Sequence, residues 1–166
     1  MKWMLLCMVC LLTACDPSRK GVVEGRLPAA SFDGEQLYLV PLRDARAENV
    51  DSVQVKDGRF RFEKTLGEPQ IFILRMRPLL RLQVQELLVV VEPGATATVV
   101  LGAPSSGGGT ALNDSLQLWK ENMGRTPEYN YAFVKNNRRN VVGKFVYSMI
   151  KGSLTPEQTE LLNMPE

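Results

Sequence analysis

Three cysteines near the start of this 166-residue sequence are the side chains whose type and spacing first suggest chemistry. Cys7 and Cys10 have the C-x-x-C spacing of thiol–disulfide oxidoreductases, and Cys15 follows five residues later. Thiolates at such spacings also bind zinc. Either chemistry needs a folded scaffold around the sulfur atoms, so the flanking residues decide between these interpretations.

The residues around the cysteines have the order of an export signal. Met1 and Lys2 give a short positive start, residues 3–12 are apolar apart from two thiols, and small residues precede Cys15. This order is typical of a secretory signal peptide. The apolar segment is also shorter than the ~20 residues that a membrane-spanning helix needs.

The four residues LTAC that end at Cys15 resemble the lipobox of bacterial lipoproteins. The resemblance implies cleavage directly before Cys15, a lipid on its sulfur atom and a lipid-anchored tether over residues 15–20. Cys7 and Cys10 would then leave with the signal peptide 1–14, and their spacing would carry no chemistry. The alternative is that the N-terminal residues form a buried hydrophobic helix or strand.

We therefore expect a protein of the bacterial cell envelope that is anchored by its N-terminal lipid and faces the periplasm. Asp16, directly after the lipid cysteine, resembles the inner-membrane retention signal of enteric lipoproteins. That rule differs between bacterial groups, so the choice between inner and outer membrane stays open.

The composition excludes several kinds of site. The sequence has no histidine, which removes the commonest general base and metal ligand at neutral pH. Ser-His-Asp and Cys-His catalytic arrangements are therefore impossible, as are zinc sites built with histidine. The net charge of +2 is too small for composition alone to indicate a nucleic acid partner. We expect no catalytic residue, no metal and no cofactor.

Two further segments have both a functional and a structural interpretation. SSGGGT (105–110) is rich in glycine but lacks the lysine of a phosphate-binding loop, so we interpret it as linker. Arg75, Arg77 and Arg81 could bind an anion or a lipid headgroup, and a solvated strand face is the favoured alternative.

Aromatic and acidic side chains give two more candidates. An aromatic set could line a ligand groove, although packing beside helices is favoured. The acidic residues in or beside loops have no spacing that pairs two carboxylates for general acid and base work. The aromatic set is Tyr129, Tyr131 and Phe133, and the acidic residues are Asp33, Glu35, Asp44, Glu48 and Asp51.

Residues 21–102 show the pattern of a β domain, with about seven apolar segments of strand length between turns that contain Gly or Pro. In the predicted hairpin 51–64, polar and apolar residues alternate around Asp57-Gly58, a pair that favours the positive φ values of a type I′ turn. The unbroken apolar runs 71–74 and 87–91 indicate strands buried on both faces. The sequence therefore predicts a mainly β fold, an antiparallel β-sandwich or partly open barrel.

The periodicity becomes helical after a Gly/Ser linker predicted at 103–111. We expect residues 112–166 to form a small helical appendage packed on the sheet. Asn113 or Asp114 is the expected N-cap of its first helix. In the last helix Thr155 should cap, and Gln158 should complete a capping box.

The order of these segments resembles the family of domain of unknown function 4369, a lipoprotein module of Gram-negative bacteria. The resemblance runs from about residue 21 to the end of the chain. It rests on the Asp57-Gly58 hairpin, the E-P-G turn at 92–94 and the G-T-x-x-N segment at 109–113. In that family the module usually precedes a thioredoxin-like domain that carries an active C-x-x-C. No W-C-x-x-C segment occurs here, so we expect a stand-alone module or the product of a shortened gene.

Together these observations predict a lipid-anchored binding or interaction module without catalytic activity of its own. Its expected partners are the membrane, through the N-terminal lipid, and a protein or ligand of the cell envelope. The alternative is an accessory subunit, or a truncated N-terminal domain, of a thioredoxin-like thiol:disulfide oxidoreductase. No nucleic acid partner is expected.

Overall fold

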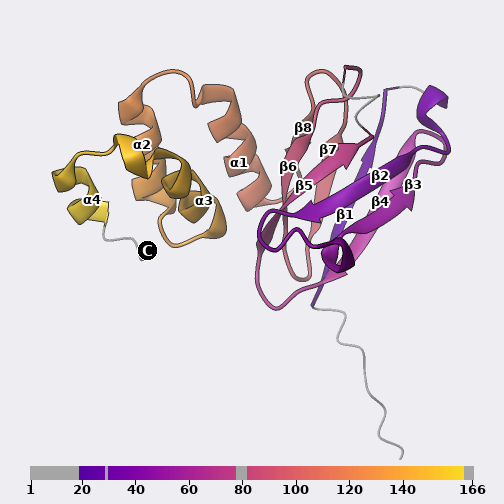
Figure 1. The fold of residues 1–166 in the computed structure, drawn as a ribbon, viewed down its shortest axis with the longest axis horizontal. Helices are drawn as coiled ribbons and strands as arrows, with labels where there is room; N and C mark the ends of the chain where they lie inside the picture. Colours follow the sequence, from indigo (N-terminus) through magenta and orange to yellow (C-terminus); the bar gives the residue numbers. More distant parts are fainter. Residues whose placement is uncertain (1–18, 29, 78–81, 163–166) are drawn as a thin grey trace, which may run out of the picture.

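The computed structural model describes residues 19–28, 30–77 and 82–162, which form eight strands in two sheets followed by four α-helices (Figure 1). Sheet A has the strand order β4-β1-β7-β8 and sheet B the order β3-β2-β5-β6. The predicted sandwich with C-terminal helices is confirmed, and the described strands form no closed barrel. The strands are β1 (Lys20–Arg26), β2 (Gln36–Pro41), β3 (Asp51–Gln54), β4 (Arg59–Thr65), β5 (Gln70–Met76), β6 (Leu87–Val91), β7 (Thr96–Val100) and β8 (Ser106–Gly108). The helices are α1 (Ala111–Asn122), α2 (Pro127–Asn137), α3 (Val141–Ile150) and α4 (Pro156–Leu162).

Strand pairing is antiparallel except between β1 and β7, which run parallel. The predicted hairpin 51–64 is divided between the sheets, because its first arm forms β3 in sheet B and its second forms β4 in sheet A. Its turn has the predicted geometry, with φ of 51° at Asp57 and 65° at Gly58. The arms separate because Val55 exchanges backbone hydrogen bonds with the segment before β2 instead of with β4.

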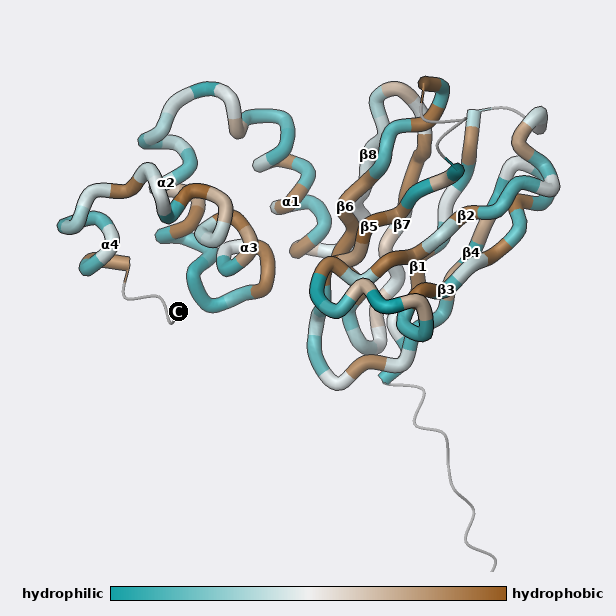
Figure 2. Tube along the Cα trace, in the orientation of Figure 1, coloured by the Kyte–Doolittle hydropathy of each residue, from teal (hydrophilic) through white to brown (hydrophobic). Residues whose placement is uncertain are grey.

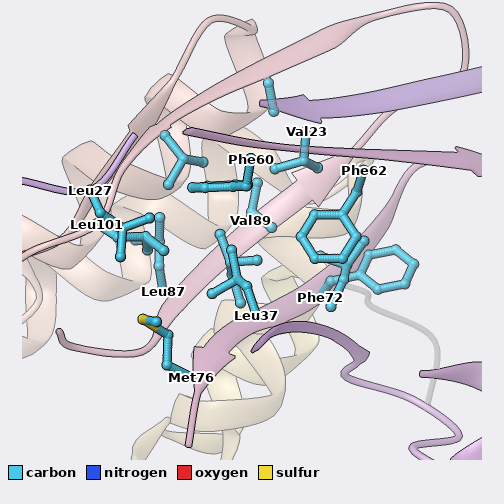
Figure 3. Packing of buried hydrophobic residues seen from close by; sticks show 14 of the residues in the cluster. Val23, Leu27, Leu37, Phe60, Phe62, Phe72, Met76, Leu87, Val89 and Leu101 are labelled. Carbon is cyan, nitrogen blue, oxygen red and sulfur yellow. The ribbon is translucent and has the colours of Figure 1, made fainter. Parts of the chain in front are cut away.

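The main core lies between the two sheets (Figure 3). Along most strands alternate residues point inward, so Val23 and Phe62 from sheet A meet Leu37, Phe72 and Val89 from sheet B. Each of these side chains is buried. A fully buried side chain of this size contributes about 1.5–3 kcal/mol, which makes this core the main source of stability.

A second core lies between the outer face of sheet B and the helices. Ile71 and Val90 project from β5 and β6 towards Leu116 and Trp119 of α1 and Val146 of α3. The prediction that these two strands are buried on both faces is confirmed. Figure 2 shows hydrophobic residues concentrated in β5, β6 and α3, the elements that share this second core.

The segment 103–111, predicted as a flexible linker, contains strand β8, which pairs with β7. The predicted N-cap of the first helix is also wrong. Thr110 is the N-cap of α1, and its hydroxyl oxygen accepts a hydrogen bond from the Asn113 backbone N–H at 3.3 Å. The capping box of Thr155 and Gln158 is confirmed by reciprocal hydrogen bonds of 3.0 and 3.1 Å.

Candidate functional site

A cleft of about 820 Å³ lies where two loops at one end of sheet B meet the start of α3. We call it the junction cleft. One loop follows β2 and the other precedes β5. Ligand sites commonly form at such concave junctions. Its wall includes the apolar side chains Leu42, Ile71 and Phe145 and the cationic side chains Arg43, Arg139 and Lys144.

Hydrogen bonds and close backbone packing fix both sides of the junction cleft. The Leu42 N–H donates to the Ile71 carbonyl at 3.0 Å, which ties the end of β2 to the start of β5. On the helical side, the Asn140 side chain caps α3 by accepting from the Gly143 N–H at 2.9 Å. A Cβ on Gly143 would lie 2.1 Å from the Asn137 carbonyl oxygen, so only glycine allows α2 and α3 to approach this closely.

Asp44 forms an ordered, charged corner of the cleft. Its φ of 60° lies in the left-handed region, where residues other than glycine are uncommon. Its carboxylate accepts hydrogen bonds from the Arg46 guanidinium at 2.5 and 2.7 Å and from the Asn49 amide at 2.9 Å. The guanidinium of Arg46, helped by Asn49, holds the pKa of the Asp44 carboxyl below its ordinary value against the opposing effect of desolvation. The negative charge of Asp44 is therefore balanced by Arg46, which does not line the cleft.

The cationic side chains of the cleft have no comparable partners. Among the described residues no ion pair involves Arg43, Arg139 or Lys144. The acids in the lining are Asp44, which is paired with Arg46, and Glu68. Glu68 offsets one of the three cationic charges, so the cleft presents an apolar wall beside a net positive charge.

The described residues of the cleft pair no nucleophile with a base. The hydroxyl of Ser148, which lines the cleft, donates to the Phe145 carbonyl at 2.7 Å, an ordinary bond within α3. Within the described ranges there is also no group of three or more Asp, Glu, Cys or His side chains that could hold a metal ion. The arrangement is suited to binding an anionic, partly apolar ligand.

A hydrogen-bonded network explains two of the three short motifs that carry the family resemblance. The Thr110 hydroxyl donates to the Glu92 carboxylate and accepts from the Asn113 side-chain amide at 2.9 Å. The Asn113 amide also bonds both backbone groups of Val90 in β6. Gly109 has φ of 87°, and a Cβ there would lie 2.8 Å from the Thr98 hydroxyl. E-P-G and G-T-x-x-N therefore join α1 to the sandwich and have a structural role.

Cys15, the predicted lipid attachment residue, lies outside the described residues, as do Cys7, Cys10 and Arg81. Lipidation of Cys15 and removal of the other two cysteines stay predictions. Each helix in the part of the chain that the structure describes lacks the length and apolar character needed to cross a membrane.

The remaining candidates from the sequence do not come together at one site. Arg75 and Arg77 are exposed and do not line the junction cleft, in keeping with a solvated strand face. In the aromatic set, Phe133 is buried against Trp119 at a ring-centroid distance of 6.4 Å, and Tyr129 and Tyr131 pack against the same core. The expected packing role of these aromatic residues is confirmed.

The acidic residues in and beside loops serve turns and ion pairs. Asp33 accepts from the N–H groups of the Asp57-Gly58 turn at 3.0 and 2.8 Å. Asp51 pairs with Lys64 at 2.7 Å, and Glu48 pairs with Arg46. Among the described residues, no hydrogen bond joins two of the five predicted carboxylates, which include Asp44 and Glu35.

The fold defines the class of this chain as a two-sheet β-sandwich with a C-terminal helical unit packed against one sheet. The sequence profile described as Domain of unknown function (DUF4369) matches residues 22–116, more than half of the chain. The chain therefore belongs to this family, as its motifs predicted. The match covers the sandwich and the first half of α1, including Glu92 and Asn113. No curated protein and no solved structure matches the chain.

Proposed function

We propose that the protein is a lipid-anchored binding module of the bacterial cell envelope and that the junction cleft holds its ligand. The observation that carries this proposal is an apolar wall beside a net positive charge, in a cleft whose described residues pair no nucleophile with a base. The ligand class that fits is an anionic amphiphile, with an acidic group joined to an apolar chain. The module itself carries out no reaction.

The apolar wall supplies the part of the affinity that depends on a hydrocarbon chain. Ile71 is buried at the base of the wall, and Leu42 is 37% exposed at its edge. Covering exposed apolar surface of this kind contributes roughly 25 cal/mol per Å². A ligand with a chain of several methylene groups would gain from this surface, and a small inorganic anion would not.

The cations supply the selectivity for acidic groups. Lys144 lies in the first turn of α3, and Arg139 directly precedes its N-cap. The N-terminus of this helix favours a negative charge as well. An acidic group would therefore meet the two side-chain charges and the helix terminus together.

The position of the cleft relative to the predicted anchor also supports this ligand class. The Leu66 N–H donates to the Arg19 carbonyl at 3.0 Å, which holds the start of the described chain against the loop between β4 and β5. That loop contributes Glu68 and Pro69 to the cleft. The six residues of the tether 15–20 span at most about 22 Å when extended, so a lipid on Cys15 would keep this loop near the membrane surface.

Binding to the cleft is tested with dodecyl phosphate as the anionic amphiphile and dodecyl maltoside as the neutral one. We expect the mature chain with Cys15→Ser to bind dodecyl phosphate more tightly than dodecyl maltoside. The double variant Arg139→Gln with Lys144→Gln should bind dodecyl phosphate about tenfold more weakly, because two charge-assisted contacts are lost. Arg75→Gln with Arg77→Gln removes the same charge elsewhere and should change little. Equal binding of the two amphiphiles, or equal effects of the two double variants, contradicts the proposal.

Anchoring is tested separately. Replacing Cys15 by Ser should release the protein from the membrane fraction and abolish labelling by a fatty-acid probe. Retention of both in the Ser variant contradicts lipidation at Cys15.

A second candidate function rests on membership of the DUF4369 family. The resemblance to modules that precede a thioredoxin-like domain favours an accessory role beside such an oxidoreductase on another polypeptide. Affinity capture of the membrane-anchored protein should then recover a thioredoxin-fold protein, and capture without one contradicts this role.

A further inference from the structure

Three cationic residues lie in direct register across the outer face of sheet A, at the end where β1 finishes and β4 begins. Lys56 is bridged to Arg59 across the Asp57-Gly58 turn, and Arg59 is the cross-strand partner of Arg26. All three side chains are exposed. We call this set the cationic row.

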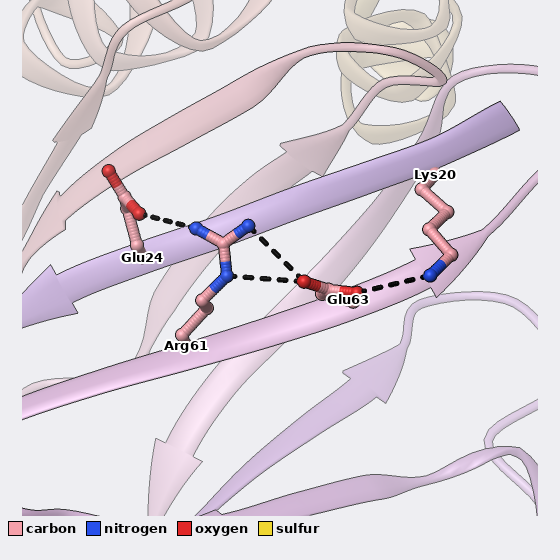
Figure 4. A network of polar contacts seen from close by, with 4 residues as sticks. All are labelled: Lys20, Glu24, Arg61 and Glu63. Atoms are coloured by element: carbon pink, nitrogen blue, oxygen red, sulfur yellow. Dashed lines mark hydrogen bonds and ion pairs between the residues drawn. The ribbon is translucent and has the colours of Figure 1, made fainter. Parts of the chain in front are cut away.

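The neighbouring positions on the same face are neutralised, which makes the cationic row distinct. Arg61 pairs with Glu24 at 2.8 Å and with Glu63 at 3.2 Å, and Glu63 pairs with Lys20 at 3.4 Å (Figure 4). Thus Lys20 and Arg61, the other cations on this face of β1 and β4, each have an acidic partner. Among the described residues, no ion pair involves any member of the cationic row.

The register of the cationic row opposes folding. Like charges directly opposite each other on paired strands are destabilising. The carboxylate of Asp33 accepts from the backbone N–H groups of Asp57 and Gly58, and among the described residues it forms no ion pair with the row. A bound anion would supply the missing negative charge.

The cationic row borders a shallow hollow of about 850 Å³. Four cationic side chains and one acid, Glu24, line it, and that acid is already paired with Arg61. Gln54, Thr98 and Ser106 add neutral hydrogen-bonding groups at its sides. Neither Asp33 nor Asp57 belongs to the lining, so the described walls leave a net positive surface with polar donors around it.

We propose that the cationic row binds a phosphoryl group. Neighbouring strands lie about 4.8 Å apart, so the oxygen atoms of one phosphate can reach both Arg26 and Arg59. Guanidinium groups bind phosphate oxygens in pairs, and Lys56 adds a third charge from the hairpin side. The phosphoryl group belongs to a soluble molecule or to a lipid headgroup.

This site is separate from the junction cleft. Arg26 ends β1, whereas Lys20 at the other end of the strand lies beside the loop between β4 and β5 that forms the cleft. The proposal therefore stands or falls independently of the function assigned to the junction cleft.

The test uses the full mature chain with Cys15→Ser and inorganic phosphate as the probe, with chloride at equal ionic strength as the control. We expect phosphate to shift the Nε–H resonances of Arg26 and Arg59 saturably. Arg26→Gln with Arg59→Gln should weaken binding by about tenfold or more, because charged hydrogen bonds are lost. Arg75→Gln with Arg77→Gln removes two charges elsewhere and should bind as the parent does.

Equal binding by the two double variants overturns the proposal, as does the absence of saturable shifts in the parent. The parent measurement decides the question even if a variant fails to fold. Vesicles of phosphatidylglycerol and of phosphatidylcholine then identify the source. Sedimentation with phosphatidylglycerol alone, lost in the Arg26 and Arg59 variant, indicates a lipid phosphate, and binding of free phosphate without sedimentation indicates a soluble ligand.

Discussion

The side chain of Asn113 bonds to β6 as a neighbouring strand would. Its amide oxygen accepts from the Val90 N–H and its amide nitrogen donates to the Val90 carbonyl, both at 2.8 Å. Asn113 is 2% exposed, so these backbone groups are satisfied by a side chain inside the protein. Asn113 thus adds a polar connection between the helical unit and sheet B to the second core, and it satisfies part of the edge of β6.

Replacing Asn113 by Ala should lower the free energy of unfolding by about 2–4 kcal/mol, because two buried backbone groups of Val90 lose their partners. Urea denaturation measures the change. Asn136, an exposed residue of α2, provides the matched control, and Asn136→Ala should stay within about 0.5 kcal/mol of the parent. Equal effects of the two substitutions would show that the contact with Val90 contributes little.

Gly143→Ala should destabilise the protein by about 1–3 kcal/mol, because the new methyl group meets the Asn137 carbonyl and the backbones of α2 and α3 must separate. The same variant should weaken dodecyl phosphate binding, since α3 forms one side of the junction cleft. Gly152→Ala is the control, because a Cβ there has open space. Thermal unfolding of both variants checks the prediction. A Gly143→Ala variant that unfolds at the same temperature as the parent protein contradicts it.

The pKa of Glu63 should lie below that of an ordinary glutamate, because hydrogen bonds from Arg61 and then Lys20 favour the charged carboxylate. A carboxyl whose pKa is lowered by folding stabilises the folded state above its unfolded pKa. That contribution disappears as the pH falls through the folded value. Carboxyl ¹³C titration should show the low pKa, and Arg61→Gln should raise it. An unchanged Glu63 titration in this variant would contradict the pairing.

Arg59→Gln should raise the free energy of unfolding by about 0.2–0.5 kcal/mol at low salt, because it removes a like charge opposite Arg26. Arg61→Gln should have the opposite sign, since Arg61 is paired with Glu24 and Glu63. Both effects should fade as salt is added, because exposed charges are screened. Chemical denaturation at two ionic strengths makes the comparison, and a salt-independent loss in the Arg59 variant would contradict it.

The spacing of apolar residues and the helix-capping residues predicted most of the fold, because strand burial and helix capping depend on residues close together in the sequence. The apolar runs at 71–74 and 87–91 identified strands buried on both faces, and Thr155 with Gln158 identified a helix start. Strand β8 escaped prediction because Ser106–Gly108 carries no apolar side chain, and only its pairing with β7 makes it a strand.

Non-local contacts explain what the sequence could not predict. Asn113 or Asp114 was expected to cap the first helix, but Thr110 is its N-cap and the Asn113 amide bonds Val90 in β6. The junction cleft combines Arg43 with Arg139, which lie in distant segments and share no spacing signal. The sequence did not predict the cationic row either. Arg26 and Arg59 lie far apart in the chain, and only the pairing of β1 with β4 places them opposite each other.

The position of β1 has a mechanical consequence. It lies inside sheet A, paired along its length with β4 on one side and with β7 on the other. Tension applied through the N-terminus would run along this strand and load the hydrogen bonds of both ladders in shear at once. An edge strand would instead peel away one bond at a time. A chain held by its N-terminus against a moving surface would thus transmit force into the most firmly connected part of the sandwich.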